Sequence, residues 1–331
     1  MTLTSLSSDL ATHPKYLWRN GETIEWERAT VHVNAVGHAS VSSVFEGIKA
    51  YYNADQDELY VFRVTEHMRR FVESVRIVRL GLNYTVDELV AGALSLLRKN
   101  KDRRDVYLRP WCFISGLVRE QIAPGGAATE MIIDSWPFTT AMLQARGCSA
   151  CISSWRRIDD TSMPPRAKVF SNYHNSRFGS IEAKQGGYDW PIFLNDRGKV
   201  TEGPGSCVAM IREGKFVTPN ISSGVLESIT RATLMEIAQD ILKLPVVERE
   251  VDRTELYVCD ELFYMGTGWE ILPITTIDGL VVGTGQMGPV ASQLDRLYHN
   301  IVRGIDVRYQ HWRTPVFRKS RTAPGSPAAR R

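Results

Sequence analysis

Lys168 is the residue whose surroundings first suggest chemistry. It lies in the stretch AKVFSNYHNSR (167–177), and Asn172 and Tyr173 follow within five residues. A lysine followed by polar and basic side chains is an unusual start for a buried element. A lysine amine is also able to form covalent intermediates with carbonyl compounds, so the segment raises the question of what Lys168 is for.

Two further segments place polar groups beside glycines. Glu202 lies in KVTEGPGS, just beyond a predicted hairpin strand, where glycines let another group approach closely. A carboxylate there can hold a protonated ring nitrogen, or it can be an ordinary charge at a strand end. The turn GTG at 266–268 offers backbone donors to an anion or is simply a tight turn. For each segment taken alone, the ordinary structural interpretation is simpler than the functional one.

An anion site is indicated where a helix is predicted to begin. Ser228, Ile229 and Thr230 follow a glycine-containing loop in SSGVLESITR. The unpaired N–H groups and the dipole at a helix start attract anions, although every helix has such a start. His67 and Arg70, on a predicted helix of the other half, supply a second cationic wall or form a solvated face.

The motif GTGQMG (283–288) has the glycine spacing of dinucleotide-binding proteins and keeps an NAD-dependent oxidoreductase as an alternative. Such a site needs a following parallel strand with an acidic residue at its end. Pro289 follows the motif at once, and the remaining sequence offers no such strand. A turn into a C-terminal helix is therefore the favoured interpretation.

The first part of the chain must position these groups with strands and two helices. Thr65 is predicted to cap the first helix, and Thr85 with Glu88 forms a capping box for the second. This mixture, without strict βαβ alternation, predicts an α+β domain over residues 1–138. The predicted strands cover 23–26, 30–36, 43–52, 58–62, 106–115 and 129–138, and the helices cover 65–78 and 86–100.

At 331 residues the chain exceeds the usual size of a single core, so a second domain is expected. The periodicity lapses over TTAMLQARG, which predicts a linker at 139–147, a large domain at 148–312 and a disordered basic tail at 313–331. The strands of this larger domain are predicted at 149–155, 191–195, 199–203, 208–211, 215–219, 246–251 and 261–266. Its helices are predicted at 175–185, 228–243, 253–257 and 290–302.

Composition argues against several classes of protein. The chain is 43% apolar and 23% charged, as soluble globular proteins are, and it has no apolar run long enough to span a bilayer. A net charge of +3 is too small to indicate nucleic-acid binding. The five cysteines are scattered, and the N-terminus lacks a signal-peptide pattern, which together predict a cytoplasmic protein. Cys148 and Cys151 have CxxC spacing without a partner pair, so no metal site is expected.

The order of these motifs resembles that of one enzyme family. Lys168 with SNY, then LNDRGKVTEG, KFVTP, VLESITR and DELFYMGTGWEILPI, follow one another as in the class IV (fold type IV) pyridoxal phosphate aminotransferases. SVFEGIKAYY, FRVTEHMRRF and VYLRP are most similar to the branched-chain amino acid aminotransferases. The resemblance covers residues 16–300. It implies a small N-terminal α+β domain and a larger domain of mostly antiparallel sheet or barrel with surrounding helices.

The resemblance also implies pyridoxal 5′-phosphate as the cofactor and assigns roles around it. Lys168 would form the Schiff base and then carry the transferred proton. Tyr173 would hydrogen-bond the phenolate oxygen of the cofactor, and Glu202 would pair with its pyridine nitrogen. The groups expected at the phosphate are Arg70, the backbone of Ile229 and Thr230, and the Thr267 hydroxyl.

Substrate binding is assigned by the same resemblance to Ser40, Phe45, Tyr107, Arg109, Gly266, Thr267 and Gly268. The chain departs from the family pattern at three places. Ser40 and Ala141 stand where the family has aromatic side chains, and Gly205 with Ser206 replaces an asparagine-containing run. A roomier, less polar pocket is therefore predicted.

The predicted reaction is ping-pong transfer of an amino group between a branched-chain or related hydrophobic amino acid, or an amine, and a 2-oxo acid. An (R)-selective amine or D-amino acid transaminase is the alternative on the same scaffold, and aminodeoxychorismate lyase is a less favoured one. The resemblance also implies a homodimer or a larger homo-oligomer.

Overall fold

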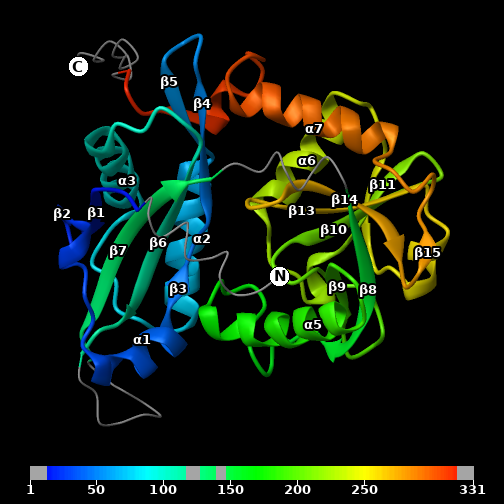
Figure 1. Ribbon diagram of the computed structural model, residues 1–331, viewed down its shortest axis with the longest axis horizontal. Helices are drawn as coiled ribbons and strands as arrows, with labels where there is room; N and C mark the ends of the chain where they lie inside the picture. The colour runs from blue at the N-terminus through cyan, green and yellow to red at the C-terminus, as the bar shows by residue number, and fades with distance from the viewer. Residues whose placement is uncertain (1–12, 117–126, 139–146, 319–331) are drawn as a thin grey trace, which may run out of the picture.

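The computed structural model of the chain describes residues 13–116, 127–138 and 147–318. Two eight-stranded sheets lie side by side in these ranges, each with helices packed on it (Figure 1). No helix in these ranges combines the length and the apolar character that crossing a membrane requires. The predicted linker lies outside the described residues except for Gly147, and so does Ala141.

The first sheet is antiparallel in every pairing of the described residues, in the order β16-β5-β4-β6-β7-β1-β2, and β3 pairs with β6. Its strands are β1 (Tyr16–Arg19), β2 (Glu22–Glu25), β3 (Val44–Phe45), β4 (Ile48–Asn53), β5 (Glu58–Phe62), β6 (Val106–Ile114), β7 (Thr129–Pro137) and β16 (Arg313–Pro315). The long pairing of β6 with β7 makes the centre of this sheet.

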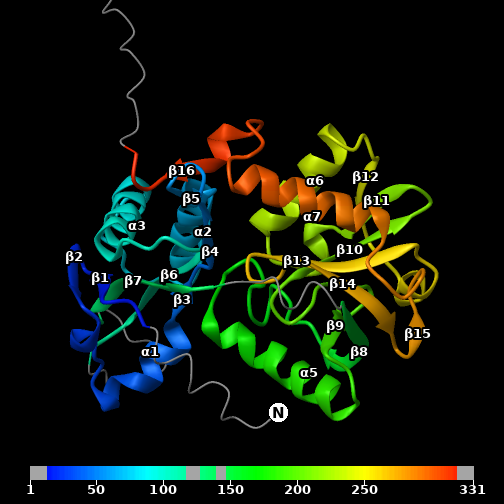
Figure 2. The same ribbon diagram turned by 45° about the horizontal axis from the view of Figure 1, so that its top comes forward.

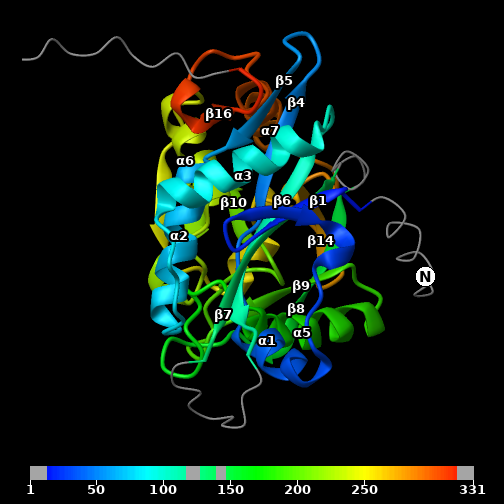
Figure 3. The ribbon, with the colours of Figure 1, turned by 90° about the vertical axis from the view of Figure 1, so that its left-hand side faces the viewer.

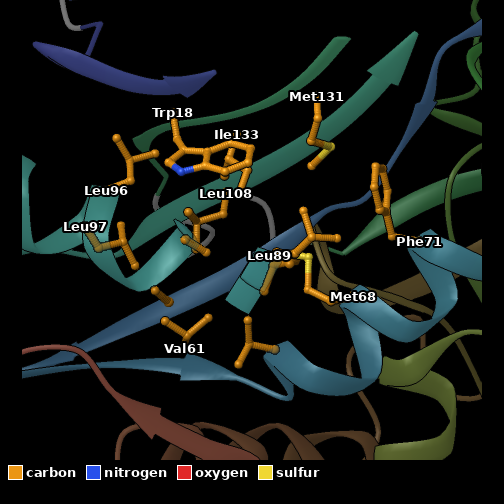
Figure 4. Packing of buried hydrophobic residues seen from close by; sticks show 14 of the residues in the cluster. Trp18, Val61, Met68, Phe71, Leu89, Leu96, Leu97, Leu108, Met131 and Ile133 are labelled. Carbon is orange, nitrogen blue, oxygen red and sulfur yellow. The ribbon is translucent and has the colours of Figure 1, made fainter. Parts of the chain in front are cut away.

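Helices α2 (Val64–Ile77) and α3 (Val86–Asn100) pack against this sheet, as Figure 3 shows. The predicted capping box is confirmed, because Thr85 and Glu88 exchange side-chain and backbone hydrogen bonds at the start of α3. Met68 and Phe71 from α2 and Leu96 from α3 are fully buried within one apolar cluster (Figure 4). Burying their side chains stabilises the fold by about 1.5–3 kcal/mol each.

The second sheet is mixed, in the order β12-β11-β10-β13-β14-β8-β9, with β15 on β14. Its strands are β8 (Cys148–Arg156), β9 (Trp190–Leu194), β10 (Cys207–Arg212), β11 (Lys215–Pro219), β12 (Val246–Arg249), β13 (Glu261–Gly266), β14 (Glu270–Ile277) and β15 (Leu280–Val281). The described pairings are parallel between β11 and β12, β14 and β8, and β8 and β9, and the others are antiparallel.

The two edges of the second sheet approach each other through one segment. Val200 bridges Leu194 at the end of β9, and Lys199 bridges Asp252 just after β12. The Val200 N–H also donates to the Val251 carbonyl over 2.9 Å. The sheet therefore curls towards a closed barrel around a core that includes Val208, as the predicted larger domain requires.

Helices α6 (Ile229–Asp240) and α7 (Pro289–Val302) lie together on one face of the second sheet (Figure 2). Helix α5 (Tyr173–Gln185) packs against β8 and β9 on another side. The 3₁₀ helices are η3 (Trp26–Arg28), η4 (Val33–Ala35), η5 (Phe170–Asn172), η6 (Ile221–Ser223), η7 (Arg253–Tyr257) and η8 (Gln310–Trp312).

Three predicted elements of the first half differ in the structure. The strand over 30–36 is wrong, because η4 and helix α1 (Val36–Ser42) occupy this region and Val33 is 76% exposed. Thr65 does not cap α2, since the N-cap is Arg63, whose N–H is held by the Trp312 carbonyl at 2.7 Å. The strand over 43–52 is divided at Glu46–Gly47 into β3 and β4.

The basic tail begins later than predicted. Residues 313–315 form β16 on the edge of the first sheet, where they pair with β5. The Val316, Phe317 and Arg318 N–H groups then donate to the buried Glu58 carboxylate over 2.8–3.0 Å. The composition of the tail does not reveal that residues 313–318 belong to the fold, because the carboxylate that anchors them is more than 250 residues away in sequence. Residues 319–331 lie outside the described residues.

Candidate active site

A cavity of about 440 Å³ is lined by residues of both sheets and of the segments between their strands. Nine of the predicted site residues line it: Phe45, Arg70, Tyr107, Lys168, Tyr173, Glu202, Gly266, Thr267 and Gly268. These positions are spread over more than 220 residues of sequence. The fold thus brings most of the predicted site together in one place.

Lys168 is held by contacts with the first half of the chain. Its N–H donates to Ser74 Oγ at 3.1 Å, and its carbonyl accepts from the Phe45 N–H at 3.0 Å. Its Nζ donates to Tyr173 Oη at 2.7 Å and lies 4.7 Å from the centre of the Phe45 ring. The amine and the phenol therefore face each other inside the cavity.

Glu202 lies in the segment after the β9 hairpin and is only 5% exposed. One carboxylate oxygen lies 2.5 Å from Arg157 Nη2, and the other accepts the Leu226 N–H at 2.9 Å. A carboxylate has about four lone-pair sites, so these two partners leave it able to accept a further donor. The next residue is Gly203. A side chain there would collide with Tyr264, since an added Cβ would lie 2.5 Å from the Tyr264 ring.

Arg70 reaches the cavity from α2 and is fixed by a buried carboxylate. Its guanidinium makes two hydrogen bonds of 2.7 Å with Glu46 and a third of 2.7 Å with the Glu227 carbonyl. His67 Nδ1 also lies 2.9 Å from Glu46. Burial alone would raise the pKa of the Glu46 carboxyl, but Arg70 and His67 outweigh burial and lower it to about 2. A fixed arginine is well suited to bind a phosphate.

The N-terminus of α6 lies beside the same groups. Ser228, the N-cap of this helix, lines the cavity and accepts the Arg231 N–H at 3.2 Å. Ile229 and Thr230 form the first turn, where helix N–H groups have no intrahelical acceptor. Among the described residues, neither of them lines the cavity, so their role at a phosphate stays a prediction.

Two predicted substrate residues lie elsewhere. Ser40 is exposed on α1 and lines a smaller neighbouring cavity that shares Tyr173 with the first. Arg109 lies on β6, where Nη2 donates to Asp134 at 3.0 Å and the guanidinium stacks on Trp111. Among the described residues, the main cavity is not lined by either of them. The position of Arg109 follows from strand pairing that the sequence does not reveal, since Arg109 lies opposite Asp134 across β6 and β7.

The GTGQMG motif does not form a dinucleotide site. Gly288 is the N-cap of α7, and the Val290 and Ala291 N–H groups donate to the buried Glu261 carboxylate at 2.9 and 2.8 Å. The helix start that would receive a pyrophosphate is thus already occupied by a carboxylate of the protein. No parallel strand follows α7 in the described residues, because β16 pairs antiparallel with β5.

Arg157 and Glu46 belong to the site but were not predicted from the sequence. Arg157 belongs to a run of charged residues (RRIDD) that is typical of a solvated loop, and nothing in that run indicates burial against Glu202. Glu46 offered a signal, since it is a charge inside the apolar segment SVFEGI. A charge in such a segment indicates a buried partner.

The chain is similar to the proteins of one known family. Residues 43–277 match the family described as Amino-transferase class IV. The chain belongs to the class IV aminotransferases. This family assignment makes it an enzyme, and the resemblance stated from its motifs is confirmed.

Relatives of this aminotransferase have similar lengths. It is 37% identical over 301 residues to the probable branched-chain-amino-acid aminotransferase of Aquifex aeolicus, covering 90% of this chain and 96% of that protein. It is 34% identical over 292 residues to the branched-chain-amino-acid aminotransferase of Escherichia coli K12, covering 87% and 93%.

Solved structures agree with this assignment. The branched-chain amino acid aminotransferase from Thermobaculum terrenum in its PLP form is 45% identical, has a TM-score of 0.89, and covers 92% of this chain and 99% of that chain. The aminotransferase therefore has the α+β, two-domain architecture of fold type IV, as predicted.

Proposed function

We propose that the aminotransferase transfers an amino group between a branched-chain or related hydrophobic amino acid and a 2-oxo acid by a ping-pong mechanism. Its cofactor is pyridoxal 5′-phosphate, which accords with its family and with the PLP form of its Thermobaculum terrenum relative. The observation that carries the proposal is the 2.7 Å contact between Lys168 Nζ and Tyr173 Oη, in a cavity that Glu202 also lines.

The residues of the cavity fit this cofactor. A phosphate is accommodated by Arg70, by the backbone donors of Ile229 and Thr230, and by the Thr267 hydroxyl. The Ser206 Oγ is buried beside them without a hydrogen-bond partner in the described residues, so the cavity also retains a polar group for a ligand. When bound, the cofactor supplies an aldehyde for the substrate amine and a ring that withdraws electrons from the substrate Cα.

Lys168 is the proposed Schiff-base lysine and the base that moves a proton. Its amine lies 4.7 Å from the centre of the Phe45 ring, in the cavity that Arg70 and Tyr173 also line. Tyr173 keeps Nζ pointing into the cavity, where it would carry a proton from the substrate Cα to the C4′ carbon of the cofactor in the first half-reaction and in the opposite direction in the second.

Glu202 is the proposed partner of a protonated ring nitrogen. A buried carboxylate remains charged only when it is paired, and Arg157 supplies the compensating charge at 2.5 Å. The remaining lone pairs of the Glu202 carboxylate can accept a hydrogen bond from a protonated ring nitrogen and so stabilise its positive charge. Arg157 is thus a positioning residue that holds the Glu202 carboxylate in place.

The substrate side of the cavity is proposed to be mainly apolar. Phe45 and Tyr107 provide rings for a hydrophobic side chain, and the Gly266–Gly268 turn provides backbone donors for a carboxylate. Gly205 and Ser206 line the cavity as the roomier pocket requires, whereas Ser40 lies outside it. Activity with (R)-amines or D-amino acids remains a proposal that rests on Gly205 and Ser206.

An absorbance spectrum and a donor panel test this function. The holoenzyme should be yellow and lose its colour with borohydride, and it should convert leucine, isoleucine and valine with 2-oxoglutarate. A Lys168→Ala variant that keeps its yellow colour after borohydride treatment and remains active would overturn the assignment of Lys168. Turnover of D-amino acids or (R)-amines alone would replace the branched-chain substrates with the second candidate.

A homodimer is also proposed, because apolar side chains are exposed together near α5. Trp155 and Phe178 stack with ring centres 4.9 Å apart and are 46% and 45% exposed, and Ile181 is 42% exposed. We propose that a second copy of the chain covers these side chains. Light scattering at a mass near 75 kDa, about twice the chain mass of 37.3 kDa, would support this dimer.

The five unpaired thiols favour a reducing, cytoplasmic location.

A further inference from the structure

Glu270 lies directly after the loop that contains the Gly266–Gly268 turn. It opens β14, and its pairing with Gly266 closes a three-residue loop over 267–269. The loop residues Thr267, Gly268 and Trp269 line the main cavity, and Glu270 is the next residue along the chain. A displacement of the Glu270 backbone would therefore displace the backbone of this turn.

The backbone of Glu270 has a conformation that favours glycine. Its φ angle is +55°, in the left-handed region where a side chain is disfavoured. Three-residue hairpin loops commonly place glycine at the residue with this conformation. A glutamate at this position indicates that its side chain makes contacts that glycine could not provide.

Those contacts are buried and come from two other parts of the fold. The Glu270 carboxylate lies 2.5 Å from Lys49 Nζ and accepts the Tyr51 hydroxyl at 2.9 Å, both from β4 of the first sheet. Its other oxygen lies 3.2 Å from His299 Nε2 on α7. Glu270 is fully buried and Lys49 is 1% exposed. The turn is thus tied through one carboxylate to the first sheet and to α7.

A buried carboxylate with these partners has little freedom to move, since each displacement leaves a charge without its counter-charge. Among the described residues, Glu270 itself does not line the cavity. Its influence on a ligand must therefore pass through the backbone of the turn.

We propose that Glu270 is a positioning residue that holds the Gly266–Gly268 turn in the shape that receives the substrate carboxylate. The inference rests on the proposed function, which places that carboxylate at the turn. Lys49 and Tyr51 act with Glu270 by fixing its carboxylate from the first sheet.

The test compares Glu270→Gln with a matched control, Glu261→Gln. Glu261 is also a buried carboxylate of the second sheet, but it accepts the N–H groups at the start of α7 and lies at the opposite end of β13 from Gly266. The probe is 4-methylpentanoate, a carboxylate without an amine, and its dissociation constant is measured from the change in cofactor absorbance. Glu270→Gln should weaken binding about tenfold with unchanged cofactor retention, and Glu261→Gln should leave it unchanged.

A second pair of variants separates the side chain from the backbone. Glu270→Gly relieves the left-handed backbone but removes the anchor, so it should weaken probe binding at least as much as Glu270→Gln. Tyr51→Phe removes one donor without disturbing the charge pair and should weaken binding about threefold, which keeps the proposal testable if Glu270→Gln fails to fold.

Wild-type probe affinity in both Glu270→Gln and Glu270→Gly, or an equal loss in Glu261→Gln, would overturn the positioning role. Failure of the proposed function gives a different result, since the wild-type protein would then neither convert leucine nor bind the probe.

Discussion

The Arg157 guanidinium lies 2.5 Å from the Glu202 carboxylate, and the two side chains are each 7% exposed. Their positions are 45 residues apart in sequence, one after β8 and the other after β9. Removing one member of a buried ion pair costs about 3–5 kcal/mol, because the other charge is left without compensation. The pair therefore fixes the position of the carboxylate proposed to face the cofactor ring.

Replacing Arg157 should impair catalysis more than substrate binding. In Arg157→Met, the buried Glu202 carboxylate loses its counter-charge and its anchor at 2.5 Å, so it is no longer held where it can pair with a protonated ring nitrogen. We expect kcat to fall about 100-fold, equivalent to about 2.7 kcal/mol, while KM for leucine changes little. Steady-state kinetics at pH 8 measure both constants.

Arg157→Lys is the control for this prediction. It retains a positive charge and should recover part of kcat. Equal losses in Arg157→Met and Arg157→Lys would point to the shape of the guanidinium rather than to its charge.

Tyr173→Phe tests the orientation of the lysine amine. The change removes the hydroxyl 2.7 Å from Lys168 Nζ and keeps the ring that packs on Phe45. We expect kcat to fall about tenfold, a modest share of what general acid–base groups contribute. The midpoint of thermal unfolding should stay within about 2 °C of the wild type. A kcat equal to that of the wild type would show that the hydroxyl has no part in the reaction.

Much of the site was predictable from sequence because its residues lie in contiguous motifs. Lys168 and Tyr173 share one segment, and Glu202 lies in another with its glycines, so each motif carries its own chemistry. The capping box of α3 was predictable for the same reason, since Thr85 and Glu88 interact within one helical turn.

The unpredicted parts depend on contacts between distant residues. Arg157 is buried against Glu202, and the start of the basic tail is held by β5 and by Glu58, which accepts its N–H groups. The alternating residues 30–36 resemble a strand, but no neighbouring strand pairs with them in the described residues. Local patterns cannot report such partners.

Gly47→Ala should disturb the substrate side of the cavity. An added Cβ at Gly47 would lie 1.8 Å from Tyr107 Oη, so the tyrosine ring must move. We expect a loss of about 1–3 kcal/mol in the free energy of unfolding, as overpacking causes, and a raised KM for leucine. Urea unfolding and initial rates measure the two effects.

Gly37→Ala is its matched control, because in the described residues no atom beyond its chain neighbours and its own helix backbone lies within 4 Å of an added Cβ there. This helical position should gain up to about 1 kcal/mol from the change. If both variants gave the same KM as the wild type, Tyr107 would not contribute to substrate binding.

The buried cluster around Glu270 should make stability depend on pH. Burial lowers the pKa of the His299 imidazole, but hydrogen bonds from its ring to Asp295 and Glu270 outweigh burial and raise it to about 9. An unfolded histidine has a pKa of about 6.5. The protonated form is thus favoured by folding, and its stabilisation is complete below pH 6.5 and is lost as the pH rises to 9.

The expected effect is measured by urea unfolding of the wild type and His299→Gln at pH 6, 7.5 and 9. At pH 6 the wild type should be more stable by on the order of 2 kcal/mol, and the difference should shrink towards pH 9. The exposed His311 makes no comparable ion pair in the described residues, so His311→Gln should retain the wild-type pH dependence. A constant difference between wild type and His299→Gln across this range would mean that His299 stays neutral and contributes only by packing.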